Sequence, residues 1–150
     1  MPAQGSDGST THEDSDRRLL RDACAGDGAA VAALYDRHSG ALYATACCVL
    51  GPGTPAEDAV VDALVDACRP HDAPSAGRRS VRHELARATY ERCAAAQTLT
   101  PAERQRAVLA LCLHGEHTYR DAVALTGARG ASLPDLLRDA VGRRDLAVPA

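Results

Sequence analysis

Three residues in the last third of the chain come closest to a metal-binding pattern. Cys112, His114 and His117 offer one thiol and two imidazoles within a short stretch, and these are the ligand types that Zn²⁺ prefers. A complete site needs a fourth ligand, and none lies nearby in the sequence. The three residues also fall at the end of a predicted helix. We therefore favour packing roles over a metal site, and we expect no bound metal.

The remaining cysteines indicate packed thiols rather than redox chemistry. The chain has six cysteines and no C-x-x-C pair. Cys47 and Cys48 are adjacent and open to a redox role, but most of the six lie in apolar helical patterns, where a free cysteine packs as a small hydrophobic residue. The sequence contains no signal peptide and no apolar run long enough to span a membrane. We expect reduced thiols, a cytoplasmic location and no membrane partner.

No residue pattern indicates catalysis. We find no Ser–His–Asp order, no Gly-rich phosphate loop and no paired-carboxylate motif above chance. We therefore expect a protein that is not an enzyme, has no catalytic residues, and acts by binding without a cofactor.

Charge is divided unevenly along the chain. All 17 basic residues are arginine. Residues 1–77 hold 5 Arg and 12 acids, a net charge of −7, whereas residues 78–150 hold 12 Arg and 8 acids, a net charge of +4. This division fits a protein that meets different partners at its two ends.

The composition predicts an all-α fold. Apolar residues make up 45% of the 150-residue chain and are mostly Ala, Leu and Val, with four Tyr and no Phe or Trp. Ala and Leu favour helices, whereas the β-branched and aromatic runs typical of strands are nearly missing. Apolar periodicity and helix-start signals predict four helices, a short linker near 94–99, and three further helices.

We predict three segments from this pattern. Residues 1–15 are polar and lack periodicity, which indicates a disordered tail. Residues 16–95 form a four-helix domain, and residues 96–150 form a three-helix domain with the layout of a helix-turn-helix. The tetrapeptide Thr-Pro-Ala-Glu occurs at 54–57 and again at 100–103, and each copy predicts a capping box.

The order of these elements resembles the sigma-70 family of bacterial RNA polymerase sigma factors, in particular the compact extracytoplasmic-function group. That group keeps two helical domains, called region 2 and region 4. The stretches LLRDACAGDGAAVAALYDRHSGALYATACCVLG and AEDAVVDALVDACR resemble region 2, and LTPAERQRAVLALCLHGEHTYRDAVALTG resembles region 4. The resemblance covers about residues 16–145 and implies a factor that binds the polymerase clamp and promoter DNA.

The resemblance also implies roles for individual residues, although a solvated surface remains the alternative for each charged set. The polymerase-binding residues would be Asp58, Asp62 and Leu64. The DNA-binding residues would be Arg82, Arg87, Arg92, Arg129, Ser132 and Arg138.

Departures from the family pattern favour a second hypothesis. Leu64 and Cys68 stand where the family carries bulky aromatics, which removes stacking surfaces for unpaired bases. In the last helix Pro134 and Asp135 stand where a basic residue is usual, and a carboxylate is repelled by phosphates. The alternative is a degenerate sigma-fold module that binds polymerase, a sigma factor or an anti-sigma factor without specific promoter recognition.

Overall fold

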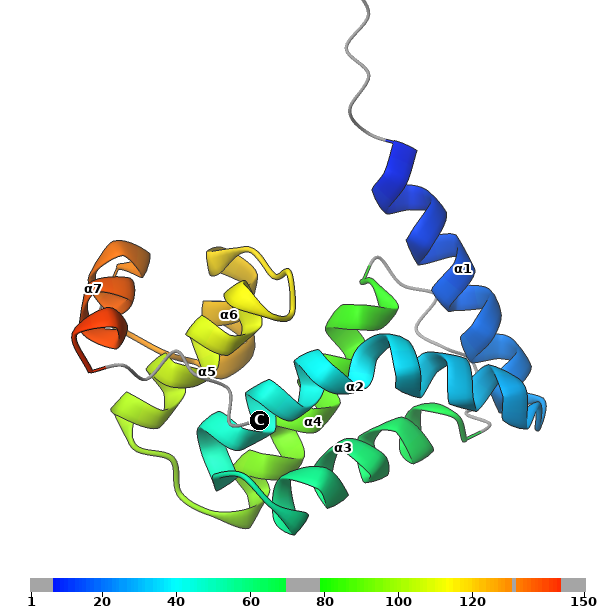
Figure 1. Ribbon diagram of the computed structural model, residues 1–150, viewed down its shortest axis with the longest axis horizontal. Helices are drawn as coiled ribbons and strands as arrows, with labels where there is room; N and C mark the ends of the chain where they lie inside the picture. Colours follow the sequence, from blue (N-terminus) through cyan, green and yellow to red (C-terminus); the bar gives the residue numbers. More distant parts are fainter. Residues whose placement is uncertain (1–6, 70–78, 131, 144–150) are drawn as a thin grey trace, which may run out of the picture.

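The computed structural model describes residues 7–69, 79–130 and 132–143, and over these ranges it contains seven helices and no strand (Figure 1). The predicted all-α fold is confirmed. The sequence predicts a loop over 70–77, between the third and fourth helices, and these residues lie outside the described ranges. The helices are α1 (Asp7–Cys24), α2 (Gly28–Leu50), α3 (Thr54–Ala67), α4 (Val81–Ala96), α5 (Pro101–Leu113), α6 (Tyr119–Thr126) and α7 (Leu133–Arg143).

Helix α1 begins at Asp7, so the predicted disordered tail over 1–15 is wrong from that residue onward; residues 1–6 are not described. Polar residues of α1 are held by distant partners. The Glu13 carboxylate accepts a hydrogen bond from the Val81 backbone N–H at 3.1 Å. Buried Asp16 lies 3.0 Å from the His38 imidazole. Burial lowers the pKa of His38, and the Asp16 carboxylate opposes this effect.

The two Thr-Pro-Ala-Glu copies begin their helices differently. Thr100 and Glu103 form the predicted capping box. At the first copy, Thr54 is already helical and Gly53 is the N-cap, without a side-chain cap, so that capping box is wrong. Gly53 has φ +123°, a conformation that favours glycine, and donates its N–H to the Tyr43 hydroxyl at 3.2 Å. Its carbonyl accepts the first N–H groups of α3, which moves the helix start one residue earlier.

Helix α2 is the centre of the fold. It packs against α1, α3, α4 and α5 (Figure 1). The buried apolar residues form one connected cluster that reaches from Ala23 to Ala140. This core is continuous across the predicted domain boundary at 95–96. The division into two domains therefore stays a prediction.

Three hydrogen bonds lie at the junction between the first four helices and the last three. The Tyr90 hydroxyl on α4 donates to the Thr126 carbonyl at the end of α6, at 3.0 Å, and Arg104 donates to the same oxygen at 2.9 Å. Burial raises the pKa of Tyr90, and Arg104 opposes this effect. The Gln97 side chain donates to the Val49 carbonyl at 2.6 Å. The Tyr90 bond joins α4 to the end of α6, whereas the Gln97 bond joins the end of α4 to α2.

We predict that Tyr90→Phe lowers the free energy of unfolding by about 1–2 kcal/mol, because it removes a buried hydrogen bond at the junction. Tyr35→Phe is the matched control, since Tyr35 is 46% exposed. Urea unfolding monitored by circular dichroism measures both. Equal stabilities of the two variants would contradict a stabilising role for the Tyr90 hydroxyl.

Candidate functional site

A cleft lies between the first half of α4 and the beginning of α6. Its volume is about 610 Å³. Ser80 caps α4 by accepting from the His83 N–H, and Thr118 caps α6 by accepting from the Asp121 N–H. Both capped helix starts contribute residues to the lining of the cleft. The side chains that line it include Arg79, Arg82, His83, Arg87, Glu116, His117 and Asp121.

Two predicted DNA-binding residues, Arg82 and Arg87, reach this cleft. Arg82 pairs with Glu116 of the α5–α6 loop at 3.0 Å, and Arg87 pairs with Glu91 at 2.8 Å. The bond to Glu91 raises the pKa of Arg87. Both guanidinium groups are partly exposed, and such surface pairs are weak enough to be exchanged for a phosphate contact.

His83 and His117 meet inside the cleft, a contact that the sequence analysis missed. Their ring centroids lie 5.4 Å apart, with the rings tilted by 44°. The backbone shapes this contact: a Cβ atom on Gly115 would lie 2.8 Å from His117 Nδ1, and Glu116 has φ +55°. Burial lowers the pKa of His117, and His83 lowers it further.

Arg92, the third predicted DNA-binding residue of α4, points to another neighbour. It forms ion pairs with Asp66 and, at 3.5 Å, with Asp62 on α3. Its charge is therefore partly neutralised by a residue predicted to bind polymerase. The basic residues of α4 do not form one continuous strip.

Of the three residues that the resemblance assigns to polymerase binding on α3, Asp58 and Asp62 are exposed and Leu64 is buried. Leu64 is only 4% exposed and packs in the core, so it offers almost no surface for a direct contact with polymerase. Val61 and Val65, which the sequence analysis missed, are 46% and 45% exposed, and Asp58 and Asp62 are exposed as well. The adjacent apolar pairs of α3 were the available signal, because one member of each pair must turn away from the core.

The predicted DNA-binding residues near α7 are arranged around Asp135. The Ser132 hydroxyl donates to the Asp135 carboxylate at 2.6 Å, and Arg138 pairs with the same carboxylate at 2.7 Å. Arg129 lies exposed in the turn before α7. Asp135 thus neutralises the positive charge that Arg138 brings to this helix.

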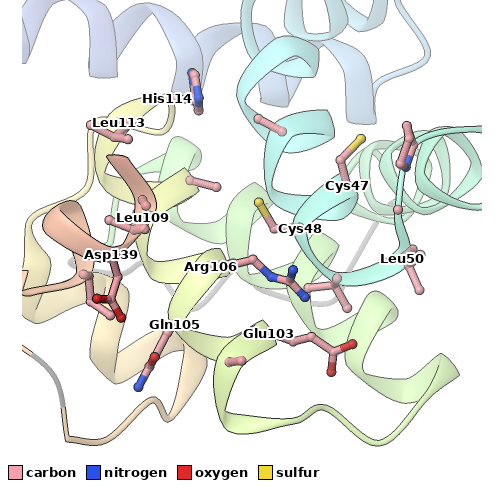
Figure 2. Close-up of a pocket in the computed structure, with 18 of the residues that line it drawn as sticks. Cys47, Cys48, Leu50, Glu103, Gln105, Arg106, Leu109, Leu113, His114 and Asp139 are labelled. Carbon is pink, nitrogen blue, oxygen red and sulfur yellow. The ribbon is translucent and has the colours of Figure 1, made fainter. Parts of the chain in front are cut away.

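A second hollow, of about 550 Å³, lies where the end of α2 meets α5 and α7. Figure 2 shows Cys47 and Cys48 on α2 and Arg106 on α5 around it. Glu103, His114 and Asp139 add charges of both signs to its lining, beside the apolar Leu109 and Leu113. This mixture favours no single class of ligand.

The three residues of the metal-like pattern separate in space. His114 lines the α2–α5–α7 hollow, whereas His117 lines the α4–α6 cleft. Burial raises the pKa of the third member, Cys112, which disfavours the thiolate that a metal would need. Within the described ranges, no group of three or more His, Cys, Asp or Glu residues is placed to hold a metal ion.

Comparison with known proteins identifies no relative: no family model, curated protein or solved structure matches the chain. Among the described residues, no helix combines the length and apolar character needed to cross a membrane. The geometry and chemistry of the chain's own surfaces therefore carry the functional argument.

We predict that the Cys93 thiol reacts with iodoacetamide at least about a hundredfold more slowly than Cys47 in the folded protein. Cys93 is completely buried, which raises the pKa of its thiol to about 11, and the thiolate is the reactive form. Cys47 is partly exposed and lines a hollow. Mass-resolved labelling at pH 8 measures both rates.

Labelling in denaturant is the control, because both cysteines should then react at similar rates. Rapid labelling of Cys93 in the folded protein would contradict its place in the core.

Proposed function

We propose that the protein is a sigma-like transcription initiation factor that binds the RNA polymerase core and promoter DNA in the cytoplasm. It acts by binding alone, without catalysis or a cofactor. The observation that carries this proposal is the separation of two surfaces: an acidic and aliphatic face on α3, and a cleft between α4 and α6 that is lined by arginines, histidines and their carboxylate partners.

The α3 face supports the polymerase-binding part of the proposal. Val61 and Val65 lie one helical turn apart and leave almost half of their surface in water. Asp58 and Asp62 border them. A partner that presents apolar side chains beside basic ones would cover the valines and pair with the carboxylates. Polymerase is the partner that the resemblance of this helix to sigma region 2 favours.

The α4–α6 cleft supports the nucleic-acid-binding part. Arg82 and Arg87 offer guanidinium groups that suit phosphate oxygens. Arg129 adds an exposed positive charge after α6. Contacts of this kind position a protein on nucleic acid without reading its sequence.

The arrangement around Asp135 favours a second candidate function, a sigma-fold module that binds a protein partner without promoter recognition. Ser132 and Arg138 both bond to this carboxylate, and Pro134 occupies the first turn of the same helix. A helix arranged in this way offers little net positive charge to a DNA groove. Duplex binding by the full chain at low salt separates the two candidates, because only the first requires it.

We predict that the double variant Val61→Ser, Val65→Ser lowers affinity for purified RNA polymerase core by about tenfold or more, since exposed apolar anchors contribute strongly to interfaces. Its melting temperature should change little, because both valines are largely outside the core. Val141→Ser, at a position 65% exposed on α7, is the matched control. Pull-down and run-off transcription from a mapped promoter provide the measurements.

Absence of polymerase binding by the wild-type chain would overturn the main proposal. Equal binding by the wild type and the double variant would show that Val61 and Val65 do not form the polymerase contact.

We predict that Arg82→Ala with Arg87→Ala weakens duplex DNA binding and lowers the slope of log affinity against log salt by roughly 2, since each lost phosphate contact removes about 0.9. Arg92→Ala should have a smaller effect, because Asp62 and Asp66 already neutralise this residue. Arg18→Ala, at an exposed position on α1, is the control. Fluorescence anisotropy across a salt series measures the slope.

An unchanged slope in the Arg82 and Arg87 variant would exclude the cleft from the DNA interface. Failure of the wild-type chain to bind duplex even at low salt would favour the protein-interaction module.

A further inference from the structure

The His83–His117 pair is the part of the cleft that the proposed function leaves unused. The two rings come from α4 and from the loop before α6, and they lie 5.4 Å apart between centroids. His83 precedes Arg87 by one helical turn, so both lie on the same side of α4. The histidine pair therefore lies beside Arg82 and Arg87, the arginines whose positive charge would attract an anion.

Neither ring nitrogen of His117 makes a hydrogen bond of normal geometry within the described part of the chain, and both are shielded from solvent. An interaction with the Gly115 backbone raises the pKa of the ring but does not satisfy either nitrogen by that geometry. A buried polar group without a partner costs about 1–3 kcal/mol, and such groups are uncommon in folded proteins. The ring is nonetheless held in place by the close approach of Gly115. An unbonded imidazole held in a cleft indicates a ligand that supplies the missing acceptor.

The permanent charges around the pair nearly cancel. Three arginines lie on α4 or just before it: Arg79, Arg82 and Arg87. The same helix carries two carboxylates, Glu91, which pairs with Arg87, and Glu84. Glu116 and Asp121 face the pair from the loop and from α6. From α1, Arg17 donates to the Arg79 carbonyl and Glu13 accepts from the Val81 N–H. Protonation of the two imidazoles is therefore the step that makes the cleft clearly positive.

We propose that the α4–α6 cleft is a proton-dependent phosphate-binding site, in which protonated His83 and His117 join Arg82 and Arg87 around one phosphate of a nucleic-acid backbone. This inference rests on the proposed function and adds regulation to it. Imidazolium N–H groups donate charge-assisted hydrogen bonds to phosphate oxygens. The neutral pair lacks that charge, so affinity rises as pH falls.

The direction of the pH effect follows from the surroundings of His117. Burial, His83 and Arg82 lower its pKa, whereas the Gly115 backbone and Asp121 oppose them without reversing the shift. In the free protein the imidazole is therefore neutral at pH 7. A bound phosphate favours the protonated form, so binding takes up protons and is strongest below the ordinary histidine pKa of about 6.5.

The test measures affinity of the full chain for a fluorescein-labelled duplex at pH 8 and pH 6, at constant ionic strength. The wild type should bind about tenfold more tightly at pH 6, the change expected from one added charge-assisted hydrogen bond. His83→Gln and His117→Gln should each reduce this difference. His114→Gln is the matched control, because this exposed histidine faces the α2–α5–α7 hollow instead.

A second measurement needs no variant. Histidine NMR titrations of the wild type, alone, with inorganic phosphate and with the duplex, should show the pKa of His117 rising on binding. A pKa rise with inorganic phosphate but not with the duplex would assign the site to free phosphate and overturn the nucleic-acid assignment. Duplex binding that is equal at both pH values, with unmoved histidine pKa values, would overturn this inference and leave the proposed function intact. Failure to bind duplex at either pH would instead overturn the DNA-binding part of the proposed function.

Discussion

The close packing of α5 against α2 is the constraint on which the rest of the structure depends. Both helices bury alanines: Ala44 and Ala46 on α2, and Ala107 and Ala110 on α5. Small side chains allow two helix backbones to approach closely, and a chain without Phe or Trp must build its core from such contacts. Each alanine buries little apolar area, so the core gains stability from the number and closeness of contacts rather than from large anchors.

The functional surfaces follow from that packing. Once α5 lies on α2, the hydrogen bond from Tyr90 to the Thr126 carbonyl fixes α6 beside α4. Only this placement brings His83 and His117, 34 positions apart in the sequence, into one cleft. The outer face of α3 is available for a separate partner because its inner face, with Val60 and Leu64, already completes the core around α2 and α4.

Local signals in the sequence predicted the helices well, because periodicity and caps act over a few residues. The Thr100 capping box occurs as expected, and the Asp27 side chain caps α2 by accepting from the Ala29 and Ala30 N–H groups. The start of α1 could not be predicted in this way, since Glu13 and Asp16 are ordered by groups on α4 and α2 that lie far along the chain. The surface that α3 offers to a partner could not be taken from the resemblance alone, because packing buries Leu64 and leaves Val61 and Val65 exposed.

The arginines of the second half illustrate why formal charge is a poor measure of an interaction surface. Residues 78–150 carry a net charge of +4, yet Arg82, Arg87, Arg92 and Arg138 each pair with a carboxylate. A nucleic acid must displace those carboxylates before it gains the same guanidinium groups, and the exchange reduces the net free energy of each contact. Exposed valines on α3 face no such competition, because a partner that covers them displaces only water. If the proposed function holds, the balance of these two effects makes the α3 face the stronger determinant of affinity, and the α4–α6 cleft adds orientation and sensitivity to protons.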